Sequence, residues 1–99
     1  ILLFDVANMK ISKPKKWDRK WWQVIFDIPN SKKKSRDYFQ KKLKSLGFYF
    51  IQESVCLHPF PCQKEIELLR EYYGIKKFVN LVRVDYFEEE YLIKRQFDL

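Results

Sequence analysis

The stretch that decides the fold of this chain runs from Trp22 to Val55 and reads WQVIFDIPNSKKKSRDYFQKKLKSLGFYFIQESV. Its start belongs to an almost unbroken run of aromatic and β-branched residues over 21–26, which is typical of a central strand covered on both faces. Pro29 has no amide hydrogen for a neighbouring strand, so the hydrogen-bonded ladder ends before it. The sequence therefore predicts a buried strand that stops at residues 27–29.

A basic helix is expected after this strand. Asn30 or Ser31 can cap its start, because short polar side chains accept hydrogen bonds from the first free amides of a helix. Apolar residues then recur at helical spacing, at Tyr38, Phe39, Leu43 and Leu46. The opposite face carries Lys32, Lys33, Lys34, Arg36, Lys41, Lys42 and Lys44. One face of the helix is therefore expected to pack on the strand while the other presents positive charge to solvent.

Gly47 stands where a helix end favours a left-handed residue, and residues 48–53 return as a strand. Residues 55–57 resume the apolar run, either as a second short strand after a tight turn or as part of one bent strand. The loop at 58–61, His-Pro-Phe-Pro, is stiff because each proline restricts its own torsions and those of the residue before it.

The second half repeats the alternation of helix and strand. Residues 62–73 have helical spacing, and Gly74 follows as a second helix end. Residues 78–87, FVNLVRVDYF, predict a strong strand. The pattern of residues 88–99 fits a short helix or an edge strand, and both remain open.

The order strand, helix, strand, strand, helix, strand predicts an α+β, ferredoxin-like βαββαβ fold. Its antiparallel sheet carries two helices on one face. The other face then needs a cover, because its aromatic residues are too many to leave in water. A two-fold homodimer or a neighbouring domain is the natural candidate.

Length and composition favour one small globular domain. The chain has 99 residues, of which 46% are hydrophobic, enough for a core without disulfides or a structural metal. Two cysteines in no metal-ligand pattern and no long apolar run favour a cytoplasmic protein without a membrane segment. Since the chain does not begin with Met, residues 1–20 are expected to be an N-terminal remnant and basic linker. The linker is anchored by Trp17, and residues 21–99 form the domain.

Positive charge points to a polyanionic partner, first of all DNA or another nucleic acid. The formal net charge is +7, from 20 Lys and Arg against 13 Asp and Glu. Phosphate contacts release counterions, so such a surplus favours binding, although scattered lysines also serve only to keep a domain soluble. Two groups of residues are the expected contacts: Lys32, Lys33, Lys34 and Arg36 at the start of the basic helix, and Lys15, Lys16 and Arg19 in the linker.

These residues carry a resemblance to a known family. The chain resembles the Cas-two family of CRISPR-associated proteins and the related middle domain of PaaX-type transcriptional repressors. The residues that carry this resemblance are the run VIFDIP, Arg36, Leu43, Gly47-Phe48, Gln52 and Ser54-Val55. The similarity spans roughly residues 17–87. The connector KPKKWDRKW and the loop HPFP are closer to the PaaX type.

The PaaX resemblance implies a non-catalytic dimerisation and nucleic-acid-binding domain of a transcriptional regulator, without a cofactor. The alternative is a Cas-two protein that acts as a metal-dependent endonuclease or a spacer-integration scaffold. In that case Asp27 is the candidate catalytic residue and Mg²⁺ ligand. Against this, Asp27 also suits a turn residue that accepts amide hydrogens from residues 29–31. Ser54, Cys56 and His58 are expected to be structural, since no base or ligand partner is spaced near them.

Overall fold

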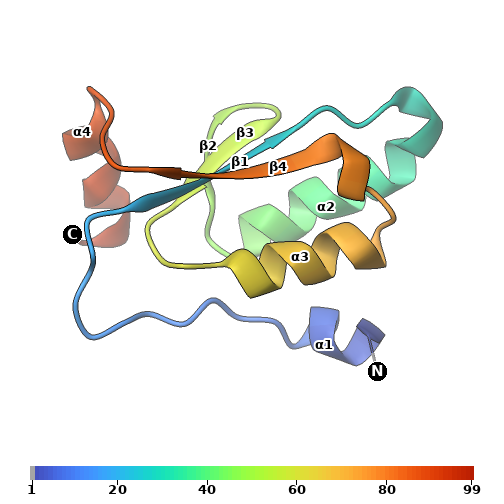
Figure 1. Cartoon of the computed structure of the whole chain (residues 1–99), viewed down its shortest axis with the longest axis horizontal. Coiled ribbons are helices and arrows are strands. Elements are labelled where there is room, and N and C mark those ends of the chain that lie inside the picture. The colour runs from blue at the N-terminus through green and yellow to red at the C-terminus, as the bar shows by residue number, and fades with distance from the viewer. Residues whose placement is uncertain (1) are drawn as a thin grey trace.

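The computed structural model of the chain describes residues 2–99 as an α+β fold with a four-stranded antiparallel sheet, which confirms the predicted fold class (Figure 1). The strands lie in the order β2-β3-β1-β4. The elements are α1 (Leu2–Ala7), β1 (Trp21–Phe26), a 3₁₀ turn η1 (Asn30–Lys32), α2 (Lys33–Ser45), β2 (Tyr49–Gln52), β3 (Val55–His58), α3 (Gln63–Tyr72), η2 (Lys76–Phe78), β4 (Val79–Val84), α4 (Glu90–Lys94) and η3 (Arg95–Phe97).

Strand β1 is central, as its continuous apolar run predicts. It pairs with β3 on one side and with β4 on the other, and the registers place Val24 beside Cys56 and Leu81. Because successive side chains of a strand point to opposite faces, Trp22, Val24 and Phe26 point to the helices. The other side chains of β1, which are Trp21, Gln23 and Ile25, lie on the opposite face of the sheet.

Helices α2 and α3 cover one face of the sheet (Figure 1). Phe39 and Leu43 of α2 are fully buried, and the Phe39 ring meets Phe26 edge to face at 5.2 Å between centroids. Leu69 of α3 completes this core. Tyr38, expected on the packed face of α2, is instead 57% exposed. One helical residue turns through about 100°, so Tyr38 lies at the border of the apolar stripe that Phe39 centres.

The start of α2 differs from the expectation, because neither Asn30 nor Ser31 caps it through a side chain. The chain first makes η1, in which the Lys32 N–H donates to the Pro29 carbonyl at 2.9 Å. The Asn30 carboxamide accepts a hydrogen bond from the Arg36 guanidinium at 3.1 Å. A turn of 3₁₀ helix thus satisfies the backbone there and leaves the Asn30 side chain for Arg36.

The two glycines end their helices as predicted. Gly47 has φ of 93° after α2, and Gly74 has φ of 66° after α3, both in the left-handed region. The alternative left open for residues 48–57 is resolved in favour of two short strands, since β2 and β3 form a hairpin with a register shift near its turn. The Ser54 carbonyl in this turn accepts the Phe26 N–H at 3.0 Å.

Strand β4 is shorter at both ends than the predicted 78–87. Phe78 closes the turn η2, and its carbonyl accepts the Asp27 N–H at 2.9 Å. Beyond Val84 the chain leaves the sheet, and Phe87 folds onto Trp21 with ring centroids 5.4 Å apart. Burial of an aromatic ring thus outweighs the local strand preference of residues 85–87.

The tail forms helix α4 and turn η3, and it covers part of the second face of the sheet. Trp21, Leu57 and Ile93 make a second buried cluster there, and the Trp21 indole N–H donates to the Glu90 carboxylate at 2.6 Å. Part of the cover expected from a partner is therefore supplied by the chain itself. Ile25 and Val82 on the same face remain 38% and 40% exposed.

The segment expected to be a remnant and linker lies against the domain. Helix α1 packs on α3, and Val6 is buried in the main core, although Ile1 lies outside the described residues. Trp17 anchors the connector as predicted, because its indole N–H donates to the carbonyls of Pro59 and Lys20 at 2.9 and 3.1 Å. Within residues 2–99, no helix has the length and apolar character needed to cross a membrane.

Candidate nucleic-acid interface

The exposed lysines at the start of α2 form a positive cluster on the surface. Lys32, Lys33 and Lys34 are all exposed and line a shallow pocket of about 560 Å³. No ion pair is found for them among the described residues. Their ammonium groups are therefore free to contact phosphate. We refer to these three residues as the lysine cluster.

Arg36 has a structural role that the sequence did not indicate. Its guanidinium donates to the Ile28 carbonyl and to the Asn30 side chain, both at 3.1 Å. A guanidinium group has five N–H donors, so the two hydrogen bonds to the chain leave other donors for a ligand. Arg36 thus holds the turn that presents the lysine cluster.

Lys15, Lys16 and Arg19 are exposed, but the structure does not bring them to the lysine cluster. The connector enters β1 at its first residue, whereas the lysine cluster follows the end of β1, and the two lie at opposite ends of the strand (Figure 1). Six strand residues span about 20 Å. The seven predicted contact residues therefore form two separate positive regions.

Asp27 lies exposed at the end of β1, in a pocket of about 440 Å³ that also includes Asp37 and Glu53. No hydrogen bond from residues 29–31 to its carboxylate is found among the described residues, and the Asp27 N–H donates to the Phe78 carbonyl. Lys33 and Arg36 line the same pocket. Across the described residues, no three His, Cys, Asp or Glu side chains come close enough to hold a metal ion.

The buried thiols lack the properties of nucleophiles. Cys56 and Cys62 are both fully buried and form no disulfide. Burial raises the pKa of Cys62 to about 12, and it raises the pKa of Cys56 as well. The thiolate is the reactive form, so both thiols are expected to be inert in the folded chain.

His58, expected to be a structural residue at the start of a loop, is the last residue of β3 and is buried among aromatic rings. Its Nδ1 accepts a hydrogen bond from the Phe60 N–H at 3.1 Å, and its ring lies against Phe48, Phe60 and Phe97. Burial lowers the pKa of His58 to about 4, against the opposite effect of backbone hydrogen bonds with Leu46 and Phe60. The ring is therefore neutral at physiological pH and serves packing.

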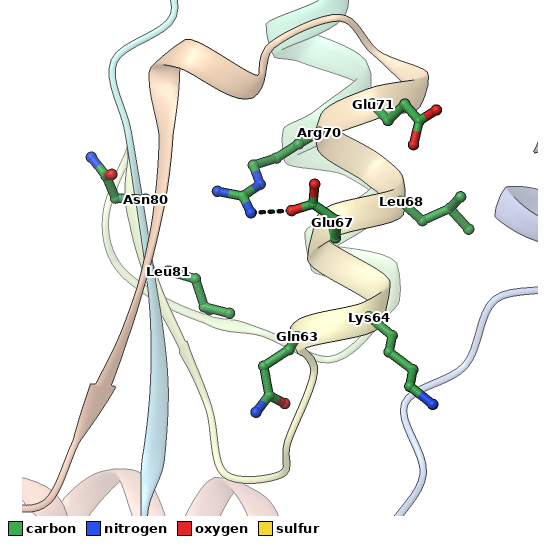
Figure 2. A pocket seen from close by; sticks show the side chains of 8 residues that line it. All are labelled: Gln63, Lys64, Glu67, Leu68, Arg70, Glu71, Asn80 and Leu81. Carbon is green, nitrogen blue, oxygen red and sulfur yellow. Dashed lines mark hydrogen bonds and ion pairs between the residues drawn. The ribbon is translucent and has the colours of Figure 1, made fainter.

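A groove of about 730 Å³ lies between α3 and the edge strand β4, with Leu81 at its floor (Figure 2). Arg70 spans it, pairing with the Glu67 carboxylate and donating to the Val79 carbonyl at 3.1 Å. Its charge is thus largely neutralised within the groove. This groove is balanced in charge, unlike the lysine cluster.

A tyrosine-lined pocket was missed by the sequence reasoning. Tyr38, Tyr72 and Tyr73 line a cavity of about 510 Å³ together with Ser35. The helical spacing of Tyr38 predicts a core position for its ring. Only the position of the tyrosines at the border of the apolar stripes on α2 and α3 could have suggested partial exposure.

Comparison with known proteins identifies one family. The family model described as the PaaX protein central Cas2-like domain matches residues 14–92, most of the chain. No curated protein and no solved structure matches significantly.

Proposed function

The chain belongs to the family of PaaX central Cas2-like domains, and from this premise we propose that it is a non-catalytic dimerisation and nucleic-acid-binding domain of a transcriptional regulator. One observation carries the binding part of this proposal: the three lysines of the cluster are exposed and unpaired among the described residues, in a chain of formal charge +7. Unpaired ammonium groups on a basic domain contact DNA phosphates and displace counterions.

The test of binding is the salt dependence of affinity for duplex DNA, measured by fluorescence anisotropy. The triple variant Lys32→Ala, Lys33→Ala, Lys34→Ala is expected to reduce the slope of log K against log salt by about 2 to 3, since each phosphate contact contributes about 0.9. The control variant Lys10→Ala, Lys41→Ala, Lys64→Ala removes three exposed charges elsewhere. Equal slopes for the two variants would show that only net charge matters and would refute a site at the lysine cluster.

The dimerisation part rests on the uncovered portion of the second sheet face. Ile25 and Val82 lie on this face beyond the reach of α4 and are well exposed, together with Tyr49. Apolar side chains side by side on a sheet are stabilised when a second copy covers them around a two-fold axis. Sedimentation equilibrium is expected to detect a dimer that Val82→Glu dissociates and Tyr91→Glu, on exposed α4, does not. A chain that is monomeric at every concentration would refute this part.

A metal-dependent nuclease is the second candidate, and the exposed Asp27 carboxylate favours it. Asp27 shares its pocket with Asp37 and Glu53, but the donors do not converge within one chain. A hard cation such as Mg²⁺ would therefore need oxygen ligands from elsewhere, for example a second Asp27 across a dimer axis. Cleavage of labelled DNA or RNA with Mg²⁺ or Mn²⁺, lost in Asp27→Asn and kept in Asp85→Asn, would establish this alternative over the first.

A further inference from the structure

The tyrosine pocket lies directly beside the lysine cluster. Ser35 lines both the tyrosine pocket and the pocket of the lysine cluster, so the two hollows are contiguous. Lys34 and Tyr38 are four residues apart on α2 and therefore lie on the same side of that helix. The start of α2, the end of α3 and α1 also gather at one end of the molecule (Figure 1).

A contact across the two helices strengthens this link. The Lys32 ammonium lies 3.9 Å from the position that a Cβ on Gly74 would occupy, so it reaches from the turn before α2 to the end of α3. Neither pocket is lined by a carboxylate among the described residues. Positive charge and aromatic surface thus occur together in these two pockets, while the carboxylates of Asp27, Asp37 and Glu53 line the neighbouring pocket that Lys33 also borders.

Tyr38 is the exposed ring of this pocket, whereas Tyr72 and Tyr73 are partly buried and pack against the main core. Tyr38 is more than half exposed, and its ring lies nearly parallel to that of Tyr73, at 17° and 6.5 Å between centroids. Tyr72 meets Tyr73 edge to face at 5.0 Å. An exposed ring face held by neighbouring rings offers a planar ligand a stacking surface at little cost in side-chain entropy.

We propose that this surface binds an unpaired stretch of nucleic acid, with a base stacked on Tyr38 and phosphates held by Lys32 and Lys34. This inference rests on the proposed nucleic-acid-binding function and names its substrate class. Single-strand binding sites combine a positive track for the backbone with aromatic platforms for the bases. In a duplex the base faces are already stacked on one another, so the Tyr38 ring would add nothing to duplex binding.

The experiment compares affinities of the chain for a 12-nucleotide single-stranded DNA, an RNA of the same sequence and the corresponding duplex, by fluorescence anisotropy. Tyr38→Ala is expected to weaken binding of the single strands about fivefold or more and to leave duplex binding unchanged, since one stacked base contributes about 1–3 kcal/mol. Tyr38→Phe should retain the affinity, because it keeps the ring. Tyr86→Ala, on another ring that is more than half exposed and lies beyond the end of β4, is the matched control.

The outcomes separate this inference from the function on which it rests. Equal single-strand affinities for Tyr38→Ala and Tyr86→Ala would overturn stacking at this pocket, even if the lysine variant still alters the salt slope for duplex DNA. An equal loss on single strand and duplex would also overturn it, by showing that the ring only supports the lysines. No binding of any nucleic acid would overturn both. The DNA and RNA arms show which sugar the site prefers.

Discussion

The pH dependence of folding is the sharpest consequence of the buried His58. Histidine ordinarily titrates near 6.5, whereas burial lowers the pKa of His58 to about 4. The unfolded chain therefore binds one more proton than the folded chain between these two values. The contribution of neutral His58 to stability is fully present above pH 6.5, and it is lost as pH falls toward 4. The difference between these two pKa values corresponds to about 3 kcal/mol of unfolding free energy. About 2 kcal/mol of it is lost between pH 7 and pH 5.

The assay uses the fact that the chain has a single histidine. Its ring signals in a proton NMR titration need no assignment by mutagenesis and report the folded-state pKa directly. Urea unfolding at pH 7 and pH 5 gives the matching free energies. In His58→Asn, the amide oxygen can replace Nδ1 as the acceptor for the Phe60 N–H, and the variant is expected to lose about 2 kcal/mol of this pH dependence. Ring signals that titrate near 6.5 in the folded chain would refute the reasoning.

Three further outcomes follow from packing. Phe39→Ala is expected to lower the free energy of unfolding by about 3–5 kcal/mol, whereas Tyr38→Ala on the exposed border of α2 should change it by less than about 1 kcal/mol, as measured by urea unfolding. Ile93→Ala should destabilise the chain by about 2–4 kcal/mol and shift tryptophan emission to longer wavelength, because water reaches the indole beneath α4. Cys56 and Cys62 should not react with a thiol reagent at pH 8 until urea unfolds the chain, and rapid labelling of the folded chain would contradict their burial.

The candidate site was predictable only in its local parts. Lys32, Lys33 and Lys34 follow from the sequence, because a polar helix face beside an apolar stripe is a local pattern. Their separation from Lys15 and Lys16 follows from the predicted strand between the two groups, because an extended strand places the connector and the lysine cluster at its two ends. The role of Arg36 in holding the turn after Ile28 needed the structure, because it depends on backbone geometry rather than residue type.

The sequence by itself determined the alternation of strands and helices. The signals for these elements each act within a few residues of the chain. They are the apolar run of β1, the stripe of Phe39 and Leu43, and the left-handed Gly47. Only the tertiary structure decided that Ile93 covers Trp21 and that Tyr38 and Tyr72 line one pocket. Such contacts join residues far apart in sequence, and the free energy of burying apolar surface does not depend on which segment provides the cover.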